Sequence, residues 1–230
     1  MSELVWERLT RHVMRCRLPF CDVTVGVVHS DGAAVVIDCG TTLTEARAVA
    51  ADVSELTGCA VTHLVLTHHH FDHVLGHPVF DGAQTFCSPE VTAALHEREW
   101  LRSDALRYGA DPQEVDDALT AAVPPAVAVP YGTVELAGVV VRISHPGRGH
   151  TGHDLIAVVT DGQDTVVFCG DLVEESGEPC VDDQSDPAAW PATLQRVVDA
   201  GGESGIYVPG HGAVVEAAFV RRQAQWLAGR

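Results

Sequence analysis

The stretch that decides the fold is "LVLTHHHFDHVLGH", residues 64–77. An apolar run ends at Thr67, and four histidines and one aspartate occupy the six positions that follow, 68–73. Imidazole and carboxylate groups placed directly after a buried strand predict a metal site, because a rigid strand end aims such side chains. A single loop supplies too few ligands, so this prediction requires further ligands elsewhere in the chain.

Three later segments offer those ligands, each beside a strand-like run. His150 lies in "HPGRGHTGHDL", Asp171 ends "TVVFCGD", and His211 lies in "YVPGHGAV". Imidazole and carboxylate suit Zn²⁺, Fe²⁺ or Mn²⁺, so the site needs no cysteine. In an extended turn His68 and His70 project to the same side, and a carboxylate such as Asp171 has two oxygens with which to bridge two cations.

Strands and helices alternate along the chain. Strands are expected at 23–30, 33–40, 61–67, 133–143, 154–160, 164–171 and 205–210, and helices at 42–58, 188–200 and 213–228. For residues 89–122 we expect a helical insertion that could act as a lid. Asp31-Gly32 is a hairpin signal, and Gly58 closes the first helix. The predicted strands fall into two groups along the chain, and each group is followed by helices. This order predicts two sheets packed between helical layers.

The motifs resemble those of a known family. "HHHFDH" is similar to the HxHxDH signature of the metallo-β-lactamase-fold hydrolases, and "GHT", "GD" and "PGHG" follow in that family's order. The resemblance spans the chain from the strand at 33–38 to His211. It implies an α+β fold, the four-layer αββα sandwich, with two divalent metal ions. Zinc is the expected metal, with iron or manganese as alternatives.

The resemblance also implies a role for each ligand. One metal would be bound by His68, His70 and His150, the other by Asp72, His73 and His211, with Asp171 bridging. Two cations about 3.5–4 Å apart lower the pKa of a bridging water and polarise the bond that it attacks. We therefore expect a hydrolase that uses a metal-bridged hydroxide, with Asp72 orienting it and moving a proton. Structural or supporting roles are expected for His69, His77, His145 and His153.

Two other functions remain open at this point. His68, His150 and Asp171 alone form a two-histidine, one-carboxylate triad, which suits a single non-haem iron. Persulfide dioxygenases of the same fold use that subset, so an oxidoreductase is the main alternative. A non-catalytic module is disfavoured, because structural metal sites are usually closed and rich in cysteine.

The amino-acid composition and net charge limit the kinds of molecule that the protein is expected to bind. The 230 residues are 46% hydrophobic, which predicts one domain over 1–230. The net charge of −18 argues against nucleic acid and anionic membranes, and leaves a small molecule as the expected partner. Seven cysteines without a CxxC pair, and an N-terminal stretch without an apolar signal region, predict a cytoplasmic protein. Both a monomer and a homodimer are compatible with the sequence.

The substrate is narrowed by elimination to a small ester, lactone, thioester or amide, with an ester or lactone preferred. All 14 basic residues are arginines, so an anion contact would need arginine, and Arg148, two residues before His150, is the nearest. The segment 172–186 carries six acidic side chains and no basic one. Its position after Asp171 predicts that it borders the site, where it would disfavour multiply anionic substrates. Only 19 residues follow His211, so the helical substrate domain of glyoxalase II-like relatives is not expected.

Overall fold

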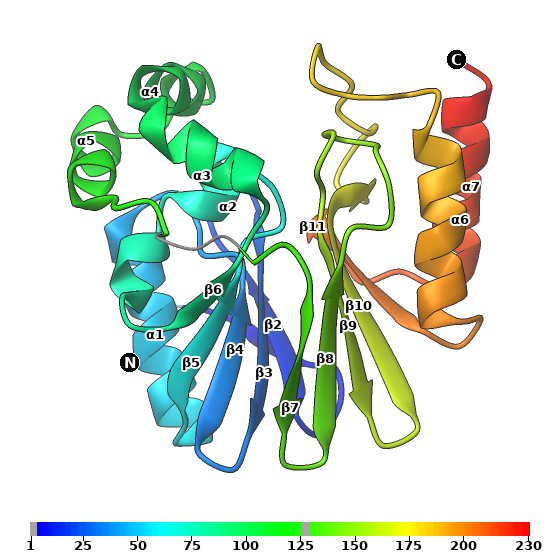
Figure 1. The fold of residues 1–230 in the computed structure, drawn as a ribbon, viewed down its shortest axis with the longest axis horizontal. Helices are drawn as coiled ribbons and strands as arrows, with labels where there is room; N and C mark the ends of the chain where they lie inside the picture. The colour runs from blue at the N-terminus through cyan, green and yellow to red at the C-terminus, as the bar shows by residue number, and fades with distance from the viewer. Residues whose placement is uncertain (1–3, 126–128) are drawn as a thin grey trace.

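Two mixed β-sheets pack face to face between helices in the computed structural model, which describes residues 4–125 and 129–230 (Figure 1). The first sheet has the strand order β1 (Trp6–Arg8), β2 (Val13–Arg17), β3 (Thr24–Ser30), β4 (Ala33–Ile37), β5 (Ala60–Val65) and β6 (Gln84–Phe86). The second has the order β11 (Ile206–His211), β10 (Asp164–Glu174), β9 (Ile156–Asp161), β8 (Val139–Ser144) and β7 (Gly132–Leu136). Pairing is parallel for β4–β5, β5–β6 and β10–β11, and antiparallel elsewhere.

Helices form the two outer layers. Helix α1 (Leu43–Thr57) covers the first sheet, and α3 (Pro89–His96), α4 (Arg98–Arg107) and α5 (Pro112–Ala121) pack above it (Figure 1). Helices α6 (Trp190–Gly201) and α7 (Ala217–Ala228) cover the second sheet. Two short helical turns, α2 (Phe71–Val74) and η1 (His77–Phe80), follow β5. The predicted αββα sandwich is confirmed.

None of the helices in the described part of the chain is long and apolar enough to cross a membrane.

Three apolar clusters fill the three interfaces between the four layers. Successive residues of β4 face different clusters, as a strand requires: Val36 packs under α1, whereas Val35 packs between the sheets against residues such as Phe168. The third cluster, under α6 and α7, is built around Trp190, whose indole N–H donates to the carbonyl of Leu172 at 3.0 Å. Strand alternation therefore holds the two sheets in a fixed relation, and with them the loops at the sheet ends.

The strongest local signals produce the expected elements. Asp31 and Gly32, both with positive φ (48° and 82°), make the tight turn between β3 and β4. Thr42 caps α1 by accepting the backbone N–H of Glu45, whose carboxylate accepts the N–H of Thr42 in return. Gly58 closes the same helix with φ of 67°.

Some elements differ from the prediction. The run 133–143 forms two strands, β7 and β8, because Gly138 adopts φ of 83° and turns the chain between them. Strand β10 continues to Glu174, beyond the predicted end at 171. The short strands β1, β2 and β6 were not predicted. The helical structure expected within 89–122 consists of three helices, α3, α4 and α5.

The two ends of the sandwich differ in character. The tight turns β3–β4, β7–β8 and β9–β10 gather at one end, at the bottom of Figure 1. There Asp161, the last residue of β9, accepts hydrogen bonds from the hydroxyl of Thr10 at 2.6 Å and the backbone N–H of His12 at 3.0 Å. Thr10 and His12 precede β2, so this carboxylate ties the two sheets together. The longer loops, with the histidine segment, lie at the opposite end.

Candidate metal centre

The structure brings all seven predicted ligands together at the end with the longer loops. The loop after β5 supplies His68 and His70, and α2 supplies Asp72 and His73. The loop between β8 and β9 supplies His150, and β10 and the end of β11 supply Asp171 and His211. One set of ligand atoms belongs to His68, His70, His150 and Asp171, and a second to Asp72, His73 and His211; within each set the atoms lie within 4.8 Å of one another. The two sheets therefore contribute jointly to both sets.

Hydrogen bonds behind the first set orient its imidazoles. The hydroxyl of Thr67 donates to Asp38 at 2.8 Å, so it accepts from Nδ1 of His68, 3.0 Å away. The carbonyl of Cys180 accepts from Nδ1 of His150 at 3.3 Å. Because each Nδ1 carries the proton, the Nε2 lone pairs of both rings face the centre.

The second set is anchored in the same way. Asp38 accepts from Nδ1 of His73 at 2.8 Å, and the carbonyl of Cys21 accepts from Nδ1 of His211 at 2.8 Å. The Nε2 atoms of these two rings lie 3.4 Å apart. Each ring thus presents Nε2 to the centre and uses its other nitrogen to hold its orientation.

His70 completes the first set with Nδ1. This atom lies 3.0 Å from Nε2 of His68 and 2.9 Å from Nε2 of His150. A single ring nitrogen has one proton or one lone pair and cannot satisfy both neighbours. The three nitrogen atoms, Nδ1 of His70 and Nε2 of His68 and His150, therefore point toward one position, as metal-binding nitrogens do around a cation.

Asp171 lies between the two sets. One carboxylate oxygen, Oδ2, is 3.6 Å from Nε2 of His68 and 3.4 Å from Nε2 of His211, and the other, Oδ1, is 3.2 Å from Nε2 of His73. Oδ1 is buried and accepts no hydrogen bond from any residue that the structure describes. A buried carboxylate oxygen without a hydrogen bond is costly unless a positive charge compensates it. The donors thus fit divalent cations, and Asp171 has the position of a bridging ligand.

Charge and burial shift the pKa values of these groups strongly. Burial and neighbouring imidazoles hold the pKa of His68 and His70 well below its usual range. Burial also acts to lower the pKa of His211, but the carboxylates of Asp171 and Asp72 outweigh it and raise this pKa to about 10. Negative charge is therefore concentrated around the second set, where it favours a cation.

Sequence patterns missed Asp38, which supports both sets of ligands. It is 2% exposed, and its backbone adopts φ of 59°, an unusual value for aspartate. One of its oxygens accepts the backbone N–H of Thr67 at 2.8 Å, and the other accepts from Thr67 and His73. The only signal in the sequence was its place at the end of a buried strand, 33–37.

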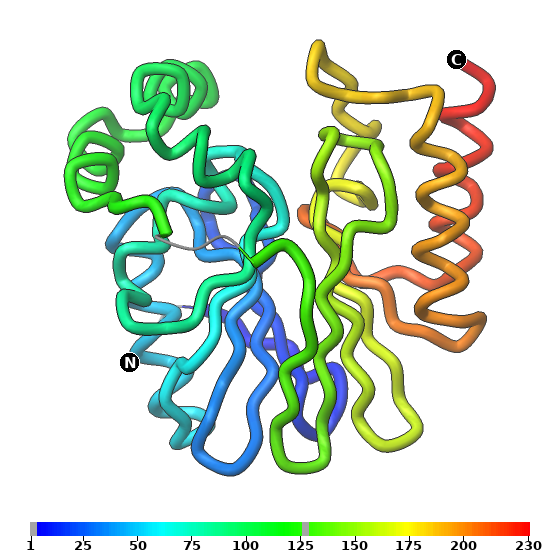
Figure 2. Tube along the Cα trace, viewed as in Figure 1, coloured from blue at the N-terminus to red at the C-terminus, as the bar shows by residue number. Residues whose placement is uncertain are grey.

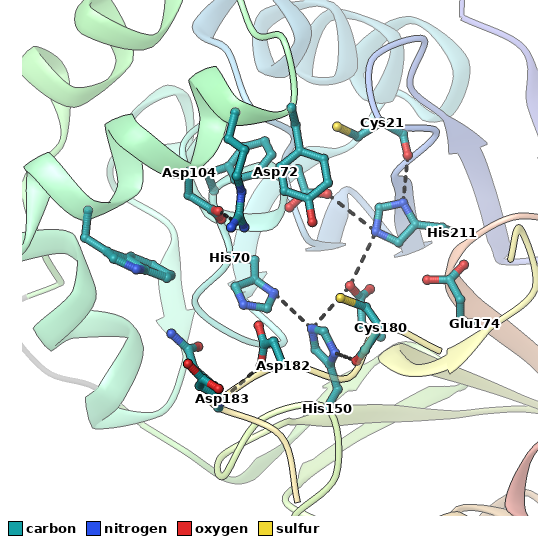
Figure 3. A pocket seen from close by; sticks show the side chains of 16 residues that line it. Cys21, His70, Asp72, Asp104, His150, Glu174, Cys180, Asp182, Asp183 and His211 are labelled. Carbon is teal, nitrogen blue, oxygen red and sulfur yellow. Dashed lines mark hydrogen bonds and ion pairs between the residues drawn. The ribbon is translucent and has the colours of Figure 1, made fainter. Parts of the chain in front are cut away.

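A cavity of about 450 Å³ opens over the two sets of ligands (Figure 3). Helix α4 and the residue after it form one wall, with Trp100, Asp104, Arg107 and Tyr108. The loop 175–189, which rises above the ends of β9 and β10 in Figure 2, forms the other. Its lining residues are Cys180, Asp182, Asp183 and Gln184. Part of the insertion thus borders the cavity, as does the acidic segment expected to do so.

Other residues singled out in the sequence lie beside the centre. Arg148 does not line this cavity: its side chain is 65% exposed and its guanidinium pairs with Asp186 at 3.3 Å, so its position gives no support to a substrate contact. His69 turns away from both sets and hydrogen-bonds His153 at 2.9 Å. Glu174, which sequence patterns also missed, lies close enough to Asp171 and His211 to form a third possible group of ligands.

Known proteins show the same architecture. The family model described as the metallo-beta-lactamase superfamily matches residues 18–211. Over 100% of this chain and 98% of the other, the crystal structure of VMB-1 superposes with a TM-score of 0.77 at 17% identity. The DIM-1 metallo-beta-lactamase gives 0.75 at 16% identity, covering 99% of this chain and 98% of that one. A metallo-beta-lactamase from Hirschia baltica gives 0.73 at 16%, covering 97% of both chains.

Proposed function

Because this chain belongs to the metallo-beta-lactamase superfamily, we propose that it is a binuclear metal-dependent hydrolase of a small ester, lactone, thioester or amide. The observation that carries the proposal is the pair of donor sets, with Asp171 belonging to the first and lying within 3.4 Å of His73 and His211 of the second. Similarity to the three solved structures supports the fold, whereas their low identity leaves the substrate open.

Two metal ions would be held by the residues already described. His68, His70 and His150 would bind one ion, and Asp72, His73 and His211 the other, with Asp171 between them. Zinc is the metal that we propose, since imidazole and carboxylate ligands suit it. Such ions lower the pKa of a water molecule and polarise the oxygen of the bond to be cleaved.

Asp72 is the residue that we assign to proton transfer. Its carboxylate lines the cavity, and Oδ2 lies 3.4 Å from Nε2 of His211 and 3.7 Å from Nε2 of His73. A carboxylate in this position can take a proton from an attacking water and deliver it to the leaving group. The aromatic rings of Trp100 and Tyr108 line the same cavity and would bind the apolar part of a small substrate.

Metal content and turnover together test this proposal. Protein purified without a histidine tag or added metal is analysed by plasma mass spectrometry, and its hydrolysis of matched esters, lactones, thioesters and amides is then measured. We expect about two zinc ions per chain, as the two donor sets imply, and turnover that a chelator abolishes and zinc restores.

The same measurements identify the oxidoreductase if that alternative holds. About one iron per chain, with oxygen uptake in the presence of a persulfide, would replace the hydrolase by the dioxygenase. Bound metal without turnover of any compound would instead favour a non-catalytic module.

A further inference from the structure

We propose that the substrate carries a positively charged group, an ammonium or a guanidinium, on the part that does not react. This group would bind near Asp182 and Asp183, which we call the acidic rim, while the scissile bond lies over the metal-binding residues. The inference rests on the proposed function, because it concerns the substrate of the same cavity.

The acidic rim stands beside the candidate metal centre. Figure 3 shows Asp182 beside His70 and His150, and Asp183 farther from them, on the loop that follows β10. Both side chains line the 450 Å³ cavity, opposite the wall formed by α4. A substrate that reaches the centre therefore passes within reach of both carboxylates.

The acidic rim carries negative charge that no described residue neutralises in an ion pair. Asp182 uses Oδ1 within its own loop, where it accepts the N–H of Gln184 at 2.8 Å and the hydroxyl of Ser185 at 3.2 Å, leaving Oδ2 free of partners among the described residues. Asp183 forms no ion pair or side-chain hydrogen bond with any described residue, yet it lines the cavity.

On the opposite wall, the guanidinium of Arg107 is already paired with a carboxylate. Arg107 is the only arginine among the described residues that line the cavity, and the sequence contains no lysine. Its guanidinium donates to Asp104 and lies 5.3 Å from the centre of the Tyr108 ring. An anionic substrate would find no uncommitted cation on this wall, whereas a cationic one would find the carboxylates of the acidic rim.

Bound metal ions at the floor of the cavity would attract negative charge, whereas the acidic rim attracts positive charge. This difference favours one orientation of the substrate. Asp171 is 8% exposed and lines the floor, and its Oδ1 accepts no hydrogen bond from a described residue, so this region calls for positive charge from bound metal. The electron-rich oxygen of an ester or amide is then drawn to the floor. A cationic tail on the same molecule is drawn to the acidic rim, so both ends favour one orientation.

Matched thiols test this inference independently of turnover, because a thiolate binds zinc directly. The zinc-loaded protein is titrated by calorimetry with 2-(trimethylammonio)ethanethiol, its uncharged isostere 3,3-dimethylbutane-1-thiol, and 3-mercaptopropanoate. The same titrations are repeated on the double variant Asp182→Asn/Asp183→Asn. Comparing the two proteins cancels the different acidities of the thiols.

We expect the double variant to bind the cationic thiol roughly tenfold more weakly than the unaltered protein does, with the uncharged thiol unaffected. Added salt should reduce this difference. The control Asp31→Asn/Asp164→Asn removes the same charge from turns at the opposite end and should leave all three affinities unchanged. Equal losses in both double variants, or no loss in either, would overturn the inference.

Turnover separates this inference from the proposed function. Acetylthiocholine and 3,3-dimethylbutyl thioacetate are isosteric thioesters that differ in charge, and we expect kcat/KM to favour the former by a similar ratio. Hydrolysis of both at equal kcat/KM would leave the hydrolase standing and remove the charge preference. Charge-dependent thiol binding without hydrolysis of any panel compound would do the reverse.

Discussion

One carboxylate outside the ligand set, Asp38, connects to both donor sets. It accepts from Nδ1 of His73 directly and reaches His68 through the hydroxyl of Thr67. Partners of this kind fix the ring orientation and raise the basicity of the nitrogen that binds metal. An unusual backbone conformation, φ of 59°, is retained at this residue, which is consistent with a positioning role.

Replacing Asp38 tests that role. Asp38→Asn replaces one of two accepting oxygens with an N–H donor, so it cannot accept the backbone N–H of Thr67 and also the bonds from the Thr67 hydroxyl and His73. We therefore expect zinc affinity to fall by roughly 10- to 100-fold. Competition with a chromophoric chelator measures the affinity of the purified variant. Asp52→Asn is the matched control, since Asp52 is 3% exposed and accepts from the indole of Trp6 at 2.7 Å, away from the centre. Equal affinity in the two variants would contradict the role assigned to Asp38.

For Asp72 we propose proton transfer, a role different from that of Asp38. Asp72→Asn keeps an oxygen that can bind metal but removes the group that accepts a proton, so we expect kcat to fall by roughly 10²- to 10⁴-fold. Metal content should fall much less, because His73 and His211 remain in the second set. Steady-state kinetics with the best panel substrate measure the loss. Asp164→Asn, in an exposed turn, serves as the control, and a matching loss there would refute the assignment.

At the scale of elements, β10 and β11 pack too closely at the centre to admit a side chain between them. A Cβ atom at Gly210 would lie 1.8 Å from Oδ1 of Asp171, and the pairing of the two strands shifts register at this point. Gly210 precedes His211 directly. The glycine therefore lets one strand place the carboxylate of Asp171 at the centre while its neighbour places the imidazole of His211 there.

Gly210→Ala should accordingly displace Asp171 and weaken both donor sets. We expect the variant to fold with lower stability, by about 1–3 kcal/mol, and to lose most bound zinc. Mass spectrometry and urea denaturation measure the two effects. Gly177→Ala is the control, because a Cβ there meets nothing within 4 Å. Full zinc content in Gly210→Ala would show that Asp171 can move without consequence.

Elements with a complete local signal could be predicted from the sequence. Thr42 and Glu45 form a reciprocal cap, and Asp31-Gly32 forms a turn with two positive φ values, so both depend only on neighbouring residues. The seven residues proposed as ligands were identified from their positions beside strand-like runs and from the resemblance to the HxHxDH family. Short edge strands such as β1, with three residues, have too little pattern to be recognised.

Features that depend on distant residues could not be predicted. Asp38 meets Thr67 and His73 only after β4 and β5 pair, 29 and 35 positions apart in the chain. Arg148 is close to His150 in sequence, yet its side chain pairs with Asp186 instead of entering the cavity. Arg107 lines the cavity because α4 packs over α2, which no periodicity indicates.

At the scale of the whole molecule, Asp161 links the two sheets far from the centre. Burial acts to raise the pKa of its carboxyl group, but hydrogen bonds from Thr10 and His12 outweigh it and hold this pKa below its usual value. A carboxyl group whose pKa is lower in the folded state contributes stability above its unfolded pKa. That contribution is lost as the pH falls through the lowered, folded value.

Asp161→Asn should therefore destabilise the protein by about 2 kcal/mol near neutral pH, as expected for hydrogen bonds to a charged group. The difference from the unaltered protein should shrink as the pH falls below the ordinary range of aspartate. Urea denaturation between pH 7 and pH 3 measures it. A difference that stays constant over this range would show that the charge of Asp161 contributes nothing.

The tight turns gathered at the end opposite the cavity have a practical consequence. Surface turns tolerate inserted residues when no buried group depends on them. Gly32 leaves open space where a Cβ would be, so its turn is not packed against its surroundings. A peptide tether inserted at this turn would anchor the protein to a solid support with the mouth of the cavity facing the solution.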